Sequence, residues 1–90
     1  MTVISVERAG PDDVTWTFSD PVADPASCAD LRVNGQGPLQ VIASTATTLT
    51  VRYDAIADPA SWEATSENGE PDFGPGRQLA PASGALDRYL

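Results

Sequence analysis

The chain has 90 residues, which is enough for one domain around a single core and too few for two. It carries 13 acidic and 5 basic residues, giving a net charge of −8, and every basic residue is an arginine. Nucleic-acid binding needs clustered cations, and these arginines are scattered singly, so no nucleic-acid partner is expected. The acidity favours solubility, with a halophilic host or a basic docking partner as the alternatives.

The residues that most often carry catalysis are missing. Histidine is absent and Cys28 is the only cysteine, which excludes Ser-His-Asp and Cys-His arrangements and any disulfide within the chain. A lone thiol is more often a small buried hydrophobe than a nucleophile. A domain this small also has little depth for a substrate cleft. We therefore expect no enzymatic activity and no cofactor.

Carboxylates fall into three groups along the chain, and none of the groups has the spacing of an EF-hand or a nonapeptide repeat. Calcium binding is an alternative, but solvated turn carboxylates explain the groups better, and we expect no metal site. The groups are Asp20, Asp24 and Asp30; Asp54 and Asp58; and Glu63, Glu67, Glu70 and Asp72.

The start of the chain, "MTVISVERAG", lacks the basic and apolar regions of a signal peptide. No stretch approaches the roughly 18 apolar residues of a membrane span. We expect neither export by a signal peptide nor a membrane partner.

Hydrophobic residues alternate with polar ones at a period of two, which predicts half-buried antiparallel strands. In "DVTWTFS", Val14, Trp16 and Phe18 share one face, and in "TTLTVRYD" Leu49, Val51 and Tyr53 do. In chain order, strands are predicted near residues 2–8, 13–19, 30–34, 39–44, 47–54, 61–65 and 83–90. This pattern predicts an all-β fold over residues 1–90, an immunoglobulin-like sandwich of two sheets and about seven antiparallel strands with Greek-key connections.

Turn residues separate the predicted strands. Asn34-Gly35 readily supplies positive φ, so we expect a hairpin that joins "DLRV" to "LQVI". Residues 25–30, "PASCAD", suggest one helical turn. The Gly- and Pro-rich stretch 66–83 is too long for an ordinary hairpin loop, and such loops tend to be functional or disordered. We expect this loop or the C-terminus to become ordered only on docking.

Four segments together resemble bacterial immunoglobulin-like domains of the kind repeated in S-layer and other surface proteins. They are "VTWTFSDPV", "DLRVNG", "TTLTVRYD" and "GRQLAPASGAL". The resemblance covers nearly the whole chain and implies a scaffold without chemistry of its own. Two features depart from the surface repeats: "SWEATS" replaces their usual Tyr-x-Val-x-Val strand, and a tandem array and an export signal are both missing.

Tailed phages are similar in carrying small immunoglobulin-like domains on their particles, which assemble in the host cytoplasm. The resemblance thus implies a virion accessory component, such as a head decoration protein, with capsid or other virion proteins as partners and a homo-oligomer on the particle as an option. The alternative is a binding or spacer repeat of a bacterial surface protein, recognising carbohydrate or spacing other domains. A third option is an intracellular adaptor.

Candidate docking residues lie late in the chain. Phe73, in the polar "EPDFGPGR" stretch, is either folded back onto the sandwich or offered to a partner as an anchor, with Arg77 as a polar companion. The terminal "GALDRYL" is either an edge strand or an arm that places Tyr89 and Leu90 in a partner's pocket.

Overall fold

The computed structural model describes residues 1–89, which form seven β-strands and no helix. The strands are β1 (Val3–Arg8), β2 (Asp13–Phe18), β3 (Leu31–Val33), β4 (Gln40–Ser44), β5 (Thr48–Arg52), β6 (Ala60–Ala64) and β7 (Ala82–Leu86). All strand pairs are antiparallel. The prediction of an all-β fold with about seven antiparallel strands is confirmed.

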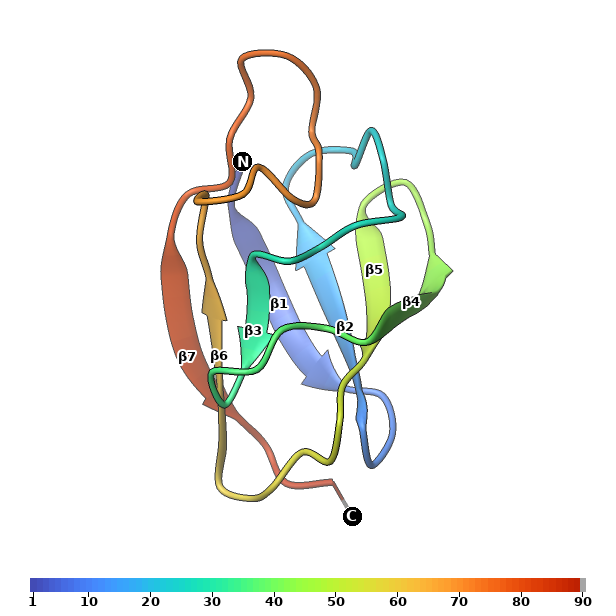
Figure 1. Ribbon diagram of the computed structural model, residues 1–90, viewed down its shortest axis with the longest axis vertical. Helices are drawn as coiled ribbons and strands as arrows, with labels where there is room; N and C mark the ends of the chain where they lie inside the picture. Colours follow the sequence, from blue (N-terminus) through green and yellow to red (C-terminus); the bar gives the residue numbers. More distant parts are fainter. Residues whose placement is uncertain (90) are drawn as a thin grey trace.

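The strands form two facing sheets (Figure 1). One sheet has the order β1-β2-β5-β4 and the other the order β3-β6-β7. Immunoglobulin domains of the constant type have this same order in their two sheets. β1 and β7 lie together and close one side of the sandwich, whereas β4 packs mainly on β5. The Greek-key description of the connections stays a prediction.

The alternation read from the sequence sets which residues fill the space between the sheets. Val14, Trp16 and Phe18 of β2 and Leu49 and Val51 of β5 are at most 1% exposed. Their neighbours in each strand are only half buried or exposed, as expected when the other face of a sheet meets solvent. The two central strands of the larger sheet therefore supply the middle of the core.

Aromatic contacts join the two sheets. The ring of Trp16 in β2 meets that of Trp62 in β6 edge to face, with centroids 5.7 Å apart. In antibody domains the disulfide joins the corresponding pair of strands. Trp16 Nε1 donates to the Tyr53 hydroxyl, which donates to the Leu31 carbonyl over 2.7 Å. Burial raises the pKa of Tyr53, so the phenol keeps the proton that it donates.

The predicted hairpin between residues 30–34 and 39–44 is wrong. Asn34 and Gly35 do form a tight turn, with φ of 52° and 78°, and Val33 pairs with Gln36 across it. The chain then crosses to the other sheet, so that β4 pairs with β5 and β3 pairs with β6. The residues predicted to form a turn do form one, but a turn does not determine which strand pairs with the strand that follows it.

Residues 25–30 contain turns instead of the predicted helical turn. The Asp24 carboxylate accepts a hydrogen bond from the backbone N–H of Ala26, which gives the chain a local alternative to a helix. This segment lies beside β4, and the two line a common groove.

The long loop predicted at 66–83 spans residues 65–81, because β7 begins at Ala82. It extends beyond the strand ends near the N-terminus (Figure 1). Asp72 pairs with Asp24, Ala80 N–H donates to the Met1 carbonyl, and Leu79 is 5% exposed. These contacts within the chain hold the loop and do not favour its ordering on docking, whereas ordering of the C-terminus on docking stays a prediction.

Candidate functional site

Phe73 is not the exposed anchor that was considered from the sequence. Its ring is 3% exposed and meets the Phe18 ring edge to face, with centroids 5.3 Å apart. Phe18 ends the buried face of β2, so Phe73 closes the core at that end. A side chain this buried has no surface to offer a partner, and the structure corrects the assignment of Phe73 as a docking residue.

Of the other candidate residues, two lie at the surface and one lies outside the described residues. The guanidinium of Arg77 forms an ion pair with Asp20, and both side chains are partly exposed. Tyr89 is 48% exposed and follows the end of β7 by three residues. Leu90 lies outside the described residues. The structure does not bring Arg77 and Tyr89 together, because the long loop that contains Arg77 and the segment after β7 that contains Tyr89 lie at opposite ends of the sandwich (Figure 1).

Asp30 was expected to be a solvated turn carboxylate, and this is wrong, because the residue is only 1% exposed. Its carboxylate accepts hydrogen bonds from the Thr65 hydroxyl, from the backbone and side chain of Asn68, and from the Glu70 N–H. Burial raises its pKa, but these hydrogen bonds outweigh burial and hold the pKa below the ordinary value of 3.8. Asp30 therefore shapes the start of the long loop and offers no acid or base for chemistry.

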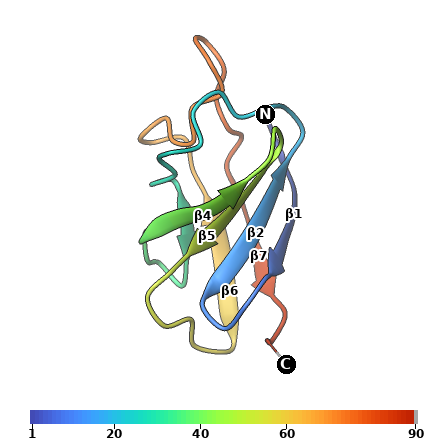
Figure 2. The same cartoon turned by 90° about the vertical axis from the view of Figure 1, so that its right-hand side faces the viewer.

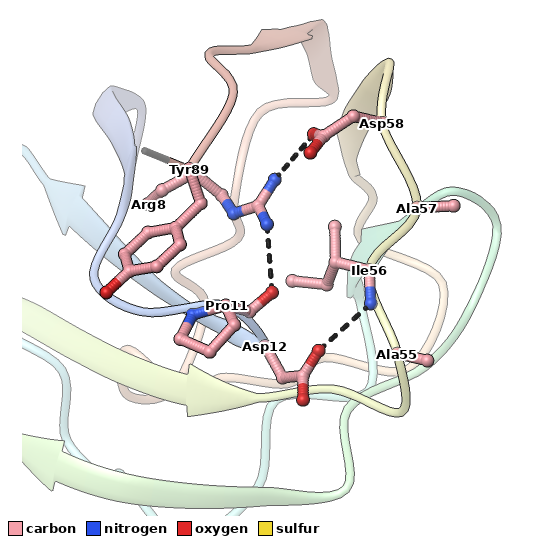
Figure 3. Close-up of a pocket in the computed structure, with 8 residues that line it drawn as sticks. All are labelled: Arg8, Pro11, Asp12, Ala55, Ile56, Ala57, Asp58 and Tyr89. Atoms are coloured by element: carbon pink, nitrogen blue, oxygen red, sulfur yellow. Dashed lines mark hydrogen bonds and ion pairs between the residues drawn. The ribbon is translucent and has the colours of Figure 1, made fainter.

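A pocket of about 310 Å³ opens at the end of the sandwich where β1 and β5 finish (Figure 3). The Arg8 guanidinium crosses it, donating to Asp58 over 2.9 Å and to the Pro11 carbonyl over 2.8 Å. The Arg8 side chain is only 5% exposed, and its Nε has no hydrogen-bond partner within residues 1–89. Tyr89 lies beside Arg8 and forms one wall of the pocket.

The chemistry of this pocket favours a neutral, hydroxyl-bearing molecule over an anion. Asp12 and Asp58 contribute two carboxylates against the one guanidinium, so a further negative charge is repelled. The exposed ring of Tyr89 supplies an apolar surface beside these polar groups. The Arg8 guanidinium, however, is already engaged and covered, so little of it faces the pocket.

A second candidate surface runs along β4, which is an edge strand of the larger sheet (Figure 2). Leu39 is 63% exposed and Ile42 is 38% exposed, and they lie three residues apart at this edge. Two adjoining grooves of about 330 and 550 Å³ follow the strand. We call this region the β4 surface; its residues are Pro25–Ala29, Gly37–Ser44 and Glu70.

The β4 surface is almost uncharged in a strongly acidic protein. Glu70 is the one ionisable carboxylate among its residues, and no arginine lines either groove. The remaining ionisable group is the thiol of Cys28, which is 3% exposed. Burial and, second, the nearby Glu70 charge raise the pKa of Cys28 to about 12, so the thiol is no nucleophile at neutral pH.

Sequence reasoning missed the β4 surface because it treated "LQVIAS" as an ordinary half-buried strand. The signal was available: the segment has no charged residue and places Leu39, Val41 and Ile42 close together without strict alternation. Val41 lies opposite the buried Val51, so alternation already places Ile42 on the outer face, and the register shift between Val41 and Ala43 sets the exposed Ala43 opposite Thr50.

Within residues 1–89, no group of three or more potential ligand side chains is placed to hold a metal ion. None of the described segments forms a helix long and apolar enough to cross a membrane. Comparisons with protein-family models, with curated proteins and with solved structures gave no match. The two surfaces described above are therefore the basis for a functional proposal.

Proposed function

We propose that the protein is a non-enzymatic structural and interaction domain that docks onto another protein through the β4 surface. The observation that carries this proposal is the exposure of Leu39 and Ile42 at an edge strand, beside two grooves whose one charged lining residue is Glu70. Scattered exposed hydrophobic residues are normal, but exposed apolar residues that line one groove, as Leu39 and Ile42 do, are typical of an interaction site. The core residues pack against one another within the sandwich, so the domain serves as a rigid support for this surface.

The setting that we propose is a virion, with the chain as an accessory component such as a head decoration protein and with capsid or other virion proteins as partners. The support for this setting is the resemblance of "VTWTFSDPV" and "TTLTVRYD" to immunoglobulin-like domains of the kind that tailed phages carry. Docking in many symmetric copies would explain why one modest surface suffices for each copy.

Co-sedimentation with particles from the source of the chain tests this proposal. We expect wild-type protein to co-sediment in stoichiometric amounts and Leu39→Glu to be lost, because the new carboxylate would be buried on docking. Ile4→Glu is the matched control, since Ile4 is 64% exposed on β1 at the opposite edge of the same sheet. Equal binding of Leu39→Glu and wild type, or no binding of either, would contradict the proposal.

A second candidate function is carbohydrate binding by a repeat of a bacterial surface protein. The observation that favours it is the pocket beside Tyr89, where an exposed aromatic ring adjoins the carboxylates of Asp12 and Asp58. Saturation-transfer NMR with glucose, galactose and N-acetylglucosamine tests it. Transfer to a sugar that Tyr89→Ala abolishes would support this candidate, and no transfer to any of the three would remove it.

A further inference from the structure

We infer that the partner occupies the β4 surface as an extended strand, which pairs with β4 through the main chain and carries lysine or arginine beside its apolar residues. This inference rests on the proposed function and deepens it by naming the form and the charge of the occupant. Three features of the surface lead to it.

The first feature is the position of β4 in the fold. β4 ends the order β1-β2-β5-β4, so within residues 1–89 no strand pairs with its outer side. An edge strand presents unpaired N–H and C=O groups along that side, and an incoming strand satisfies them at little cost. The two grooves run along the same strand, between it and residues 25–29, and provide room for side chains of the incoming strand.

The second feature is that β4 lacks the charges that commonly block such pairing. β1 carries Glu7 and Arg8, and Arg32 in β3 forms ion pairs with Glu63 and Glu67. β7 is uncharged, but β1 lies against it across the sandwich. β4 has no charged residue, and only the non-strand residues 25–29 lie beside its outer side, across the two grooves. The edge is thus left open to a partner.

The third feature is the charge around the grooves. Glu70 lines one groove, and Asp24 pairs through its backbone with Asp72 next to Pro25, so carboxylates flank one end of the surface. With no arginine among the lining residues, a basic segment gains attraction here and an acidic one is repelled. A second copy of this chain would bring its own net charge of −8 and is disfavoured.

The test uses a short synthetic peptide in which valine and threonine alternate and lysines flank both ends. We expect it to bind the wild-type chain at low salt and to slow hydrogen exchange at the amides of residues 40–44. The same peptide with N-methyl groups on alternate residues loses the donors along one edge and should bind at least ~tenfold more weakly. A version with glutamates in place of the lysines should weaken to a similar extent.

Three outcomes would overturn the inference. They are equal binding of the methylated and unmethylated peptides, failure of the lysine-flanked peptide to bind, and concentration-dependent dimerisation that protects residues 40–44 without any peptide. These outcomes are distinguishable from failure of the proposed function. If the partner docked through side chains alone, the inference would fail, but Leu39→Glu would still abolish binding to the particles.

Discussion

The hydrogen bonds around Asp30 explain how a small domain without a disulfide holds a long loop. One buried carboxylate collects donors from residues 65, 68 and 70, and the Asp30 N–H and C=O bond to Glu70 and Thr65 as well. A buried charge is costly unless it is fully hydrogen-bonded, and here the lowered pKa of Asp30 indicates that the bonds outweigh the burial. Asp30 therefore links β3 to the end of β6 and the loop.

Asp30→Asn should lower the free energy of unfolding at pH 7 by about 2–3 kcal/mol, because bonds to a charged acceptor are replaced by weaker or unmade ones. The folded pKa of Asp30 lies below 3.8, so its stabilising effect is present above about pH 4 and is lost as the pH falls through the folded pKa. Urea unfolding of both proteins between about pH 2 and about pH 7 checks this. Two results would refute this role of Asp30. One is a loss of unfolding free energy in Asp30→Asn that is as large at low pH as at neutral pH, and the other is an equal loss in Asp54→Asn, at the exposed Asp54.

Phe73 allows a second test at the residue scale. Phe73→Ala should lower the free energy of unfolding by about 3–5 kcal/mol, because it removes the ring that packs on Phe18 and leaves a cavity. Leu39→Ala, at a 63% exposed position, should change stability by less than about 0.5 kcal/mol. Thermal melts of the two variants measure the difference. A Phe73→Ala protein as stable as wild type would mean that the ring is not part of the core.

At the scale of the strands, the packing of Trp62 depends on a glycine in the neighbouring strand. Trp62 in β6 is paired with Gly84 in β7, and a Cβ at Gly84 would lie 2.7 Å from the indole Nε1. Such a contact is too short to persist, so the ring that meets Trp16 would have to move. Gly84 therefore sets the position of the aromatic contact between the sheets.

Gly84→Ala should destabilise the fold by about 1–3 kcal/mol and change the tryptophan fluorescence of the folded state. Gly37→Ala is the control, because a Cβ there meets nothing within 4 Å and the backbone is not in the left-handed region. Urea unfolding followed by fluorescence gives both quantities. If the two variants behaved alike, the close approach of Trp62 to Gly84 would not be important for stability.

The strands themselves could be predicted from the sequence because alternation is a local signal. Val14, Trp16 and Phe18 were assigned to the core, and all three are buried there. Pairing and layer were not predictable in the same way: the Asn34-Gly35 turn is present, yet the strand after it joins the other sheet. Strand order depends on contacts far apart in sequence, which no local pattern reports.

The candidate site was hardly predictable, and for a related reason. Phe73 lies among polar residues, so its sequence context favoured exposure as much as burial, and only its contact with Phe18 decides between them. The β4 surface depends on β4 being last in its sheet, and this position follows from tertiary pairing. The pocket at Arg8 likewise joins residues from β1, the 55–58 segment and the C-terminal segment.

At the scale of the whole molecule, Cys28 reports on the integrity of the sandwich. The thiol is 3% exposed and its pKa is raised to about 12 by burial first and by Glu70 second. Iodoacetamide should therefore label native protein very slowly at about pH 7.5 and rapidly above the urea midpoint. Mass spectrometry of the quenched protein follows the label. Fast labelling without urea would show that the region beneath the β4 surface opens in the native state.

We propose that the sandwich meets its partner at the β4 surface and not at the Arg8 pocket. Amide hydrogen exchange, compared between the chain alone and the chain saturated with particles from its source, distinguishes these two surfaces. We predict new protection at residues 39–44 on the particle, with residues 8–12 and 55–58 unchanged. New protection around the Arg8 pocket with residues 39–44 unaffected would contradict the account and place the binding site at the other end of the fold.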